Sequence, residues 1–191
     1  MKRISRWTIL LLITLPLFSN AQQEEPDYSG GFDKSRLFVG GNFGLSFGNF
    51  TFINISPQLG YRFSPAFAAG VGINGQYSSM RRRYIDGTTA SREDYGVAGL
   101  NVFGRLYPIQ QAFLQLQPEL NYTWGKFREY NPERDYKLDG KIVPSVLAGA
   151  GAAIPAGRGA MVIMIQYDIL QQNRSPYGNR PIYNFGYNIG L

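Results

Sequence analysis

An alternation of apolar and small polar residues, with a period of two, runs through most of the chain after residue 36 and limits the possible folds more than any other feature. Successive side chains of a β-strand point to opposite faces, so this period indicates strands whose two faces meet different surroundings. In one stretch Ile53 and Ile55 alternate with Asn54 and Ser56. The pattern predicts eight strands, at residues 37–47, 53–63, 67–78, 98–106, 114–124, 142–154, 161–169 and 183–191.

The two faces of these strands differ in composition. One face carries large apolar side chains, and the other carries mostly Gly, Ser, Asn and Gln with few charges. A face in contact with water normally carries many Lys and Glu, whereas small polar residues suit the crowded interior of a narrow barrel whose apolar residues face lipid. We therefore expect an all-β fold, an eight-stranded antiparallel up-and-down transmembrane β-barrel over residues 36–191. The alternative is a soluble periplasmic barrel that buries its apolar face around a ligand.

The connections between the expected strands alternate in length. Short links are expected at residues 64–66, 108–111 and 155–159, and long polar loops at 79–93, 125–140 and 171–181, with one tight loop at 48–50. Transmembrane barrels have short periplasmic turns and longer outer loops. We therefore expect the three long loops to lie on the outer surface, where they are available to an unidentified protein partner.

The N-terminal residues have the features of an export signal. Three basic residues precede a short apolar stretch, and Ser19-Asn20-Ala21 supplies small residues before a cleavage point. The apolar stretch is shorter than the roughly 20 residues that a transmembrane helix needs. We expect residues 1–21 to be a cleaved signal peptide and residues 22–35 a flexible periplasmic lead-in. The protein is then expected in the outer membrane of a Gram-negative bacterium.

The composition excludes several classes of function. The chain contains no His and no Cys, so neither histidine-based hydrolysis nor thiolate metal binding is available. Three of its 19 basic residues and none of its 13 acidic residues lie before residue 22, which leaves the remainder with a net charge of +3. Such a mild excess does not indicate nucleic-acid binding. We expect a protein that is not an enzyme and uses no cofactor and no metal.

Several features resemble a known family of membrane proteins. They are the Gly- and aromatic-rich strands, the Phe63-Ser64-Pro65 and Tyr107-Pro108 turns, and the alternating final strand from Tyr183 to Leu191. Over about residues 36–191 the chain resembles the small outer-membrane β-barrel domain proteins of the outer-membrane protein A and X type, including the PorT-like group. The resemblance implies insertion by the barrel-assembly machinery. The chain ends in Leu191 where many members end in Phe.

Four charged residues are expected to face the interior of the barrel: Arg62, Arg105, Glu119 and Asp168. Unpaired charge in a narrow, poorly hydrated interior is expensive, so we expect these side chains to pair with one another. Eight strands leave room only for side chains, which favours a closed, plugged lumen. The alternatives are a narrow pore lined by the same charges, or an accessory component of a transport or secretion apparatus, which the PorT-like resemblance suggests.

A cluster of three arginines, Arg81-Arg82-Arg83, opens one of the expected long loops. Arginine binds phosphate well through its planar guanidinium, so these residues are candidates for contact with lipopolysaccharide in the outer leaflet. The simpler interpretation is a solvated loop of mixed charge.

Aromatic residues gather near the ends of the expected strands and are interpreted as girdles at the two membrane interfaces, where amphipathic rings prefer to lie. The residues assigned to these girdles are Phe47, Phe50, Phe52, Tyr61, Phe63, Phe67, Tyr77, Tyr107, Phe113, Tyr122, Trp124 and Tyr183.

Overall fold

A computed structural model of the protein describes residues 31–177 and 179–191. The expected signal peptide at 1–21 and most of the expected lead-in at 22–35 lie outside the described residues. A short 3-10 turn, η2 (Lys34–Arg36), precedes the first strand. The strands that follow are β1 (Leu37–Ser46), β2 (Phe50–Ser64), β3 (Phe67–Arg83), β4 (Thr89–Ile109), β5 (Ala112–Tyr130), β6 (Glu133–Ala156), β7 (Gly159–Asp168) and β8 (Ile182–Gly190).

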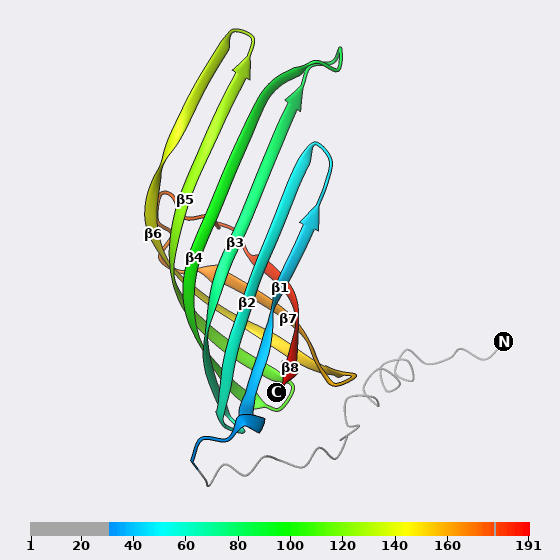
Figure 1. The fold of residues 1–191 in the computed structure, drawn as a ribbon, viewed down its shortest axis with the longest axis vertical. Coiled ribbons are helices and arrows are strands. Elements are labelled where there is room, and N and C mark those ends of the chain that lie inside the picture. Colours follow the sequence, from blue (N-terminus) through cyan, green and yellow to red (C-terminus); the bar gives the residue numbers. More distant parts are fainter. Residues whose placement is uncertain (1–30, 178) are drawn as a thin grey trace, which may run out of the picture.

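The fold is all-β, as the alternation predicts. Each strand pairs antiparallel with the next along the chain, and β1 also pairs with β8, so eight up-and-down strands form a closed ring (Figure 1). The closing ladder runs from the pair Phe38↔Gly190 to the pair Asn42↔Gly186. No helix within residues 31–177 and 179–191 is long and apolar enough to span a membrane.

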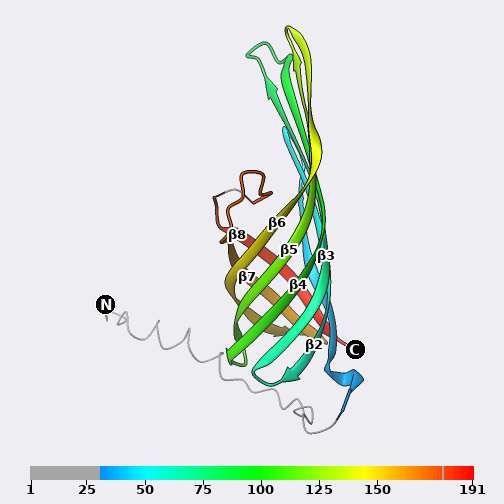
Figure 2. The same cartoon turned by 90° about the vertical axis from the view of Figure 1, so that its left-hand side faces the viewer.

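The strands differ greatly in height. The hairpins of β3–β4 and β5–β6 continue far beyond the last pair of β6 with β7, Leu147↔Asp168 (Figure 1). They build a tall wall on one side of the ring, which Figure 2 shows in profile. We call the upper part of this wall the raised sheet, and it consists of residues 77–83 of β3, 89–96 of β4, 124–130 of β5 and 133–139 of β6.

The prediction of long loops at 79–93 and 125–140 is therefore wrong. Both stretches are mostly strand, and their turns shrink to residues 84–88 and 131–132. The alternation does continue through them, but the outer face becomes charged and the inner face mixes aromatic, apolar and charged residues. The apolar face that identified the lower strands is consequently absent there. The third expected loop, at 171–181, is confirmed as a connection without regular strand between β7 and β8.

The end of the ring opposite the raised sheet is filled by apolar side chains. Tyr107 and Phe113 are 6% and 1% exposed and pack with Ala68, Val162 and Met164 inside the ring. These two aromatic residues belong to the expected girdles but face inward, and so do Phe50 and Phe52, which lie opposite Met80 and Ser78. Gly151 makes room for one of them, because a Cβ at that position would collide with the Phe113 ring.

Candidate functional site

The outer surface of the ring carries a continuous band of exposed apolar side chains. Leu100, Leu120 and Ile142 are 67%, 61% and 65% exposed on three neighbouring strands. On the same strands Asn101, Asn121 and Val143 are almost fully buried inside the ring. Other members of the band are Val39, Phe43, Ile55, Leu59, Val71, Ile73, Val102, Leu106, Leu114, Leu116, Ile163, Ile165, Phe185 and Ile189.

Aromatic residues mark the edge of this band toward the raised sheet. Tyr77, Tyr122 and Trp124 are exposed on the outer face of β3 and β5. Trp124 lies opposite Gly96 of β4, and a Cβ at Gly96 would collide with the indole. The glycine therefore lets the indole lie close against the neighbouring strand. These three residues belong to the set that the sequence assigns to a girdle, and their place at a membrane interface stays a prediction.

Beyond these aromatic residues the outer face changes from apolar to charged. The strand registers place its residues in two rows across four strands. The lower row is Ser79, Asp94, Lys126 and Lys137, and the upper row is Arg81, Arg92, Arg128 and Asp135. The two rows together hold five cations and two carboxylates, so these eight positions carry a net positive charge of three.

The inner face of the raised sheet also changes in character. In the ring the inward side chains are mainly amides and hydroxyls, but above it aromatic and apolar residues alternate with charged residues such as Arg82, Glu93, Glu129 and Arg134. The Phe127 and Tyr136 rings contact each other across β5 and β6, tilted by 37° with centroids 6.1 Å apart. On the neighbouring β2, Phe50 stacks on Phe52 at the same separation. The other apolar members of this inner face are Met80, Tyr95 and Leu138.

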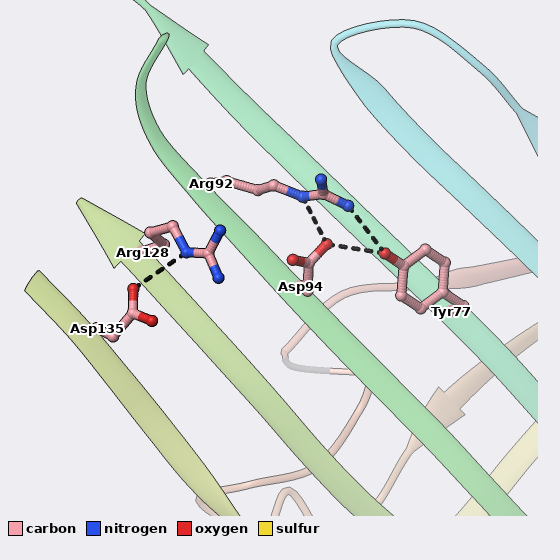
Figure 3. Close-up of polar contacts among 5 residues, drawn as sticks. All are labelled: Tyr77, Arg92, Asp94, Arg128 and Asp135. Carbon is pink, nitrogen blue, oxygen red and sulfur yellow. Dashed lines mark hydrogen bonds and ion pairs between the residues drawn. The ribbon is translucent and has the colours of Figure 1, made fainter. Parts of the chain in front are cut away.

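Ion pairs partly neutralise the charged rows, as Figure 3 shows. Arg92 donates from Nε to Asp94 at 3.0 Å, and the Tyr77 hydroxyl donates to the same carboxylate oxygen at 2.8 Å. Asp135 is paired twice, with Lys126 at 2.7 Å and with Arg128 at 3.1 Å. The hydrogen bond from Lys126 and the charge of Arg128 lower the pKa of the Asp135 carboxyl from its ordinary value of 3.8.

Inside the ring, Arg105 is 2% exposed and is held by neutral groups. It donates from Nε to Gln115 at 2.6 Å and from Nη2 to Gln58 at 3.0 Å. With its amide oxygen turned toward the guanidinium, Asn188 accepts from Nη1 at 3.0 Å. The rings of Phe38, Phe103 and Phe113 surround the guanidinium, with centroids 4.8 to 5.8 Å from its central carbon. Amide oxygens and ring faces thus replace water around this cation.

Glu119 lies higher in the lumen, and two glutamines of β5 connect it to Arg105. The side chains of Gln115, Gln117 and Glu119 all point inward because they are two residues apart along one strand. Gln115 donates to Gln117, and Gln117 donates to Glu119 Oε1 at 2.6 Å. Each amide turns its oxygen toward the cation and its nitrogen toward the carboxylate. The chain of dipoles therefore stabilises both charges at once.

The segment between β7 and β8 closes the upper lumen. Tyr177 donates from its hydroxyl to Glu119 Oε2 at 2.5 Å, and Asn121 donates to the same oxygen at 2.9 Å. Asp168 anchors the start of the segment by accepting from the backbone N–H of Val146 and of Leu170, and from the Ser175 hydroxyl at 2.6 Å.

A cavity of about 170 Å³ remains in the lumen beneath Tyr177. Amide side chains supply much of its polar lining, including Asn54, Asn74, Gln76 and Asn184. The apolar core around Phe113 and the layer around Arg105 fill the ring below Glu119. Within the described residues the lumen is therefore occupied by side chains over most of its length.

The four expected lumen charges do not pair with one another among the described residues. Arg105 and Glu119 are buried as expected, but Gln115 and Gln117 separate them. The Asp168 carboxylate is fully buried and accepts hydrogen bonds from the Val146 backbone N–H of β6 and from the Ser175 hydroxyl of the segment between β7 and β8. Arg62 is only partly buried near the short turn, where its guanidinium carbon lies 4.4 Å from the centroid of the Tyr107 ring. Neutral donors and acceptors stabilise the buried charges without ion pairs, because Arg105, Glu119 and Asp168 each have several hydrogen-bond partners.

The arginine cluster is divided between the two faces of the raised sheet. Arg81 lies opposite Arg92 on the outer face, whereas Arg82 lies opposite Ser91 on the inner face. Consecutive side chains of a regular strand point to opposite faces, so Arg81 and Arg82 do not share a face, and the register shifts between Arg82 and Arg83. The other cations of the outer face belong to β4, β5 and β6. They are neighbours in space although they are separated in the sequence.

Sequence reasoning missed Tyr177, because nothing local distinguishes it from other residues of a polar loop. It also missed the role of Gln115 and Gln117, although the alternation does assign both to the inner face. Among residues 31–177 and 179–191, no group of three or more acidic side chains is placed to hold a metal ion. Comparison of the chain with protein-family models gave no match, and comparison with curated proteins gave none either.

Proposed function

We propose that this chain is an integral outer-membrane β-barrel with a closed lumen, which acts without catalysis by displaying the raised sheet at the cell surface. The ring anchors the protein in lipid, and the raised sheet and the segment after β7 form the part that meets lipid headgroups or a protein partner. The observation that carries the proposal is the reversal of the outer face, from apolar to charged, near Tyr77, Tyr122 and Trp124.

The reversal has a simple physical explanation in a membrane. Lipid requires an apolar outer face, and water above the lipid requires a charged one. Aromatic residues with polar atoms prefer the boundary between the two. A soluble barrel has no reason to change the character of its outer face at one level across several strands, or to leave Leu100 and Leu120 more than half exposed.

Side chains in the lumen favour a closed scaffold over a pore. The apolar core around Phe113, the Arg105 layer and Tyr177 occupy successive levels of the lumen. An eight-stranded barrel has an interior that side chains just fill. Single-channel recording in planar bilayers should accordingly show no discrete conductance, whereas stable openings would support the narrow-pore alternative.

The membrane position can be tested directly because the chain has no cysteine of its own. Single-cysteine variants Leu120→Cys and Lys126→Cys would be labelled with a fluorescent maleimide and refolded into vesicles that contain brominated lipid. Bromine quenches fluorophores that lie within the acyl chains. We expect strong quenching at position 120 and weak quenching at position 126. Equal, weak quenching at both positions would overturn the proposal and favour a soluble barrel.

A further inference from the structure

Three arginines stand in register on adjacent strands of the raised sheet. Arg81 lies directly opposite Arg92, and Arg92 lies directly opposite Arg128. One row lower, Lys126 lies directly opposite Lys137. Like charges in directly opposed positions destabilise a sheet, so local stability does not explain this arrangement. Asp94 and Asp135 relieve only part of the repulsion, because they are two carboxylates among five cations.

The distance of the two rows from the aromatic edge determines which part of the membrane the cations contact. The lower row lies two residues beyond Tyr77 and Trp124, about 7 Å along the strands, and the upper row about 13 Å. The headgroup region on each side of a bilayer is roughly 5 to 8 Å thick. Because the strands are tilted, the lower row then lies among lipid phosphates and the upper row at their outer limit.

We propose that Arg81, Arg92, Lys126, Arg128 and Lys137 form a binding site for the phosphate groups of anionic lipid in the leaflet on the raised-sheet side. This inference rests on the proposed membrane position. The charges are complementary, and the planar guanidinium binds phosphate through parallel hydrogen bonds. Both carboxylates contact their arginines through Nε, which is the nitrogen nearest the strand. Apart from Arg92 Nη2, which donates to the Tyr77 hydroxyl at 3.4 Å, the Nη nitrogens of Arg92 and Arg128 are the ones that a phosphate would bind.

Two double variants with the same loss of charge provide the test. Arg81→Gln with Arg128→Gln removes two cations from the outer face. Arg82→Gln with Arg134→Gln removes two from the inner face, since Arg134 lies opposite Glu129 and next to Asp135. Binding of diphosphoryl lipid A to the refolded full chain in detergent would be titrated by native mass spectrometry, with monophosphoryl lipid A and inorganic phosphate as further probes.

We expect the outer-face variant to lose roughly thirtyfold in apparent affinity for diphosphoryl lipid A, because two cations that each contribute about 1 kcal/mol near a membrane surface together correspond to that factor. The inner-face variant should bind like the unmodified protein, and monophosphoryl lipid A should bind more weakly. Equal losses in both variants, or none in either, would overturn the site. Equally strong binding of inorganic phosphate would also overturn it, because the ligand would then be a free anion.

The two proposals fail in different ways. Failure of the membrane proposal appears as weak quenching at position 120 in the unmodified protein, before any lipid is titrated. Failure of the lipid site alone leaves that quenching intact and removes only the difference between the two double variants. Unchanged mobility shifts between boiled and unboiled samples on gels would show that both variants still fold.

Discussion

Arg105 and Glu119, the buried cation and the buried carboxylate of the lumen, are joined through the side chains of Gln115 and Gln117 and make no direct ion pair. Direct pairs of opposite charge recover their desolvation cost only when the geometry is excellent. Here each charge has several hydrogen-bond partners instead, and the amide dipoles between them are aligned. The network spans the middle of the ring and ends at Tyr177 in the closing segment.

Interrupting this chain of amides should destabilise the ring. Gln117→Leu leaves the buried Gln115 amide without its acceptor and Glu119 without one of its donors. We expect a loss of about 2 to 3 kcal/mol in unfolding free energy, measured by urea titration of the gel mobility shift. Gln76→Leu is the matched control, because Gln76 also faces the lumen but belongs to another strand and, among the described residues, makes no hydrogen bond to Gln115, Gln117 or Glu119. Equal losses in the two variants would contradict the role of the chain.

Removing the Tyr177 hydroxyl should loosen the closing segment and leave the ring intact. Tyr177→Phe keeps the aromatic ring but deletes the hydrogen bond to Glu119. We expect faster amide hydrogen exchange across residues 169–176, with unchanged exchange in β4 and β5. The lumen should remain silent in bilayer recordings, because the Arg105 layer still fills it. Tyr183→Phe, on the exposed outer surface, is the control and should have no effect on exchange in the segment.

A cation in the apolar band should impair insertion. Leu120 is 61% exposed, so an arginine there would be harmless in a soluble barrel. Near the middle of a bilayer it should cost about 2 to 4 kcal/mol. We expect Leu120→Arg to refold poorly into vesicles, while Tyr130→Arg near the tip of the raised sheet refolds normally. The yield of the form that migrates differently without boiling measures the difference, and equal yields would argue against lipid around Leu120.

The ion pairs of Asp135 should make the tip of the raised sheet sensitive to acid. The pKa of this carboxyl is lowered in the folded protein by Lys126 and then by Arg128, so its contribution to stability is complete above the ordinary value of 3.8. That contribution is lost as the pH falls through the lowered pKa. Carbon-13 titration of the Asp135 carboxyl should place its midpoint below 3.8, and Lys126→Met should move it upward. A midpoint unaffected by Lys126→Met would contradict the assignment.

The sequence alone determined the strands of the ring and the side to which each residue points. This information is local: a period of two assigns Asn101 and Leu100 to opposite faces, and the apolar composition of one face follows directly. The burial of Arg105, Glu119 and Asp168 followed from the same alternation.

Only the tertiary structure decided which residues meet. The contact of Tyr177 with Glu119 joins residues 58 positions apart, and it depends on the path of a segment with no regular pattern. The row of Arg81, Arg92 and Arg128 depends on the registers of three strands, which side-chain alternation does not specify beyond its parity. The height of the raised sheet was also beyond sequence reasoning, because above the aromatic edge the outer face turns from apolar to charged and the inner face becomes mixed. Alternation reports which residues share a face, whereas strand pairing around a closed ring decides which of them become neighbours.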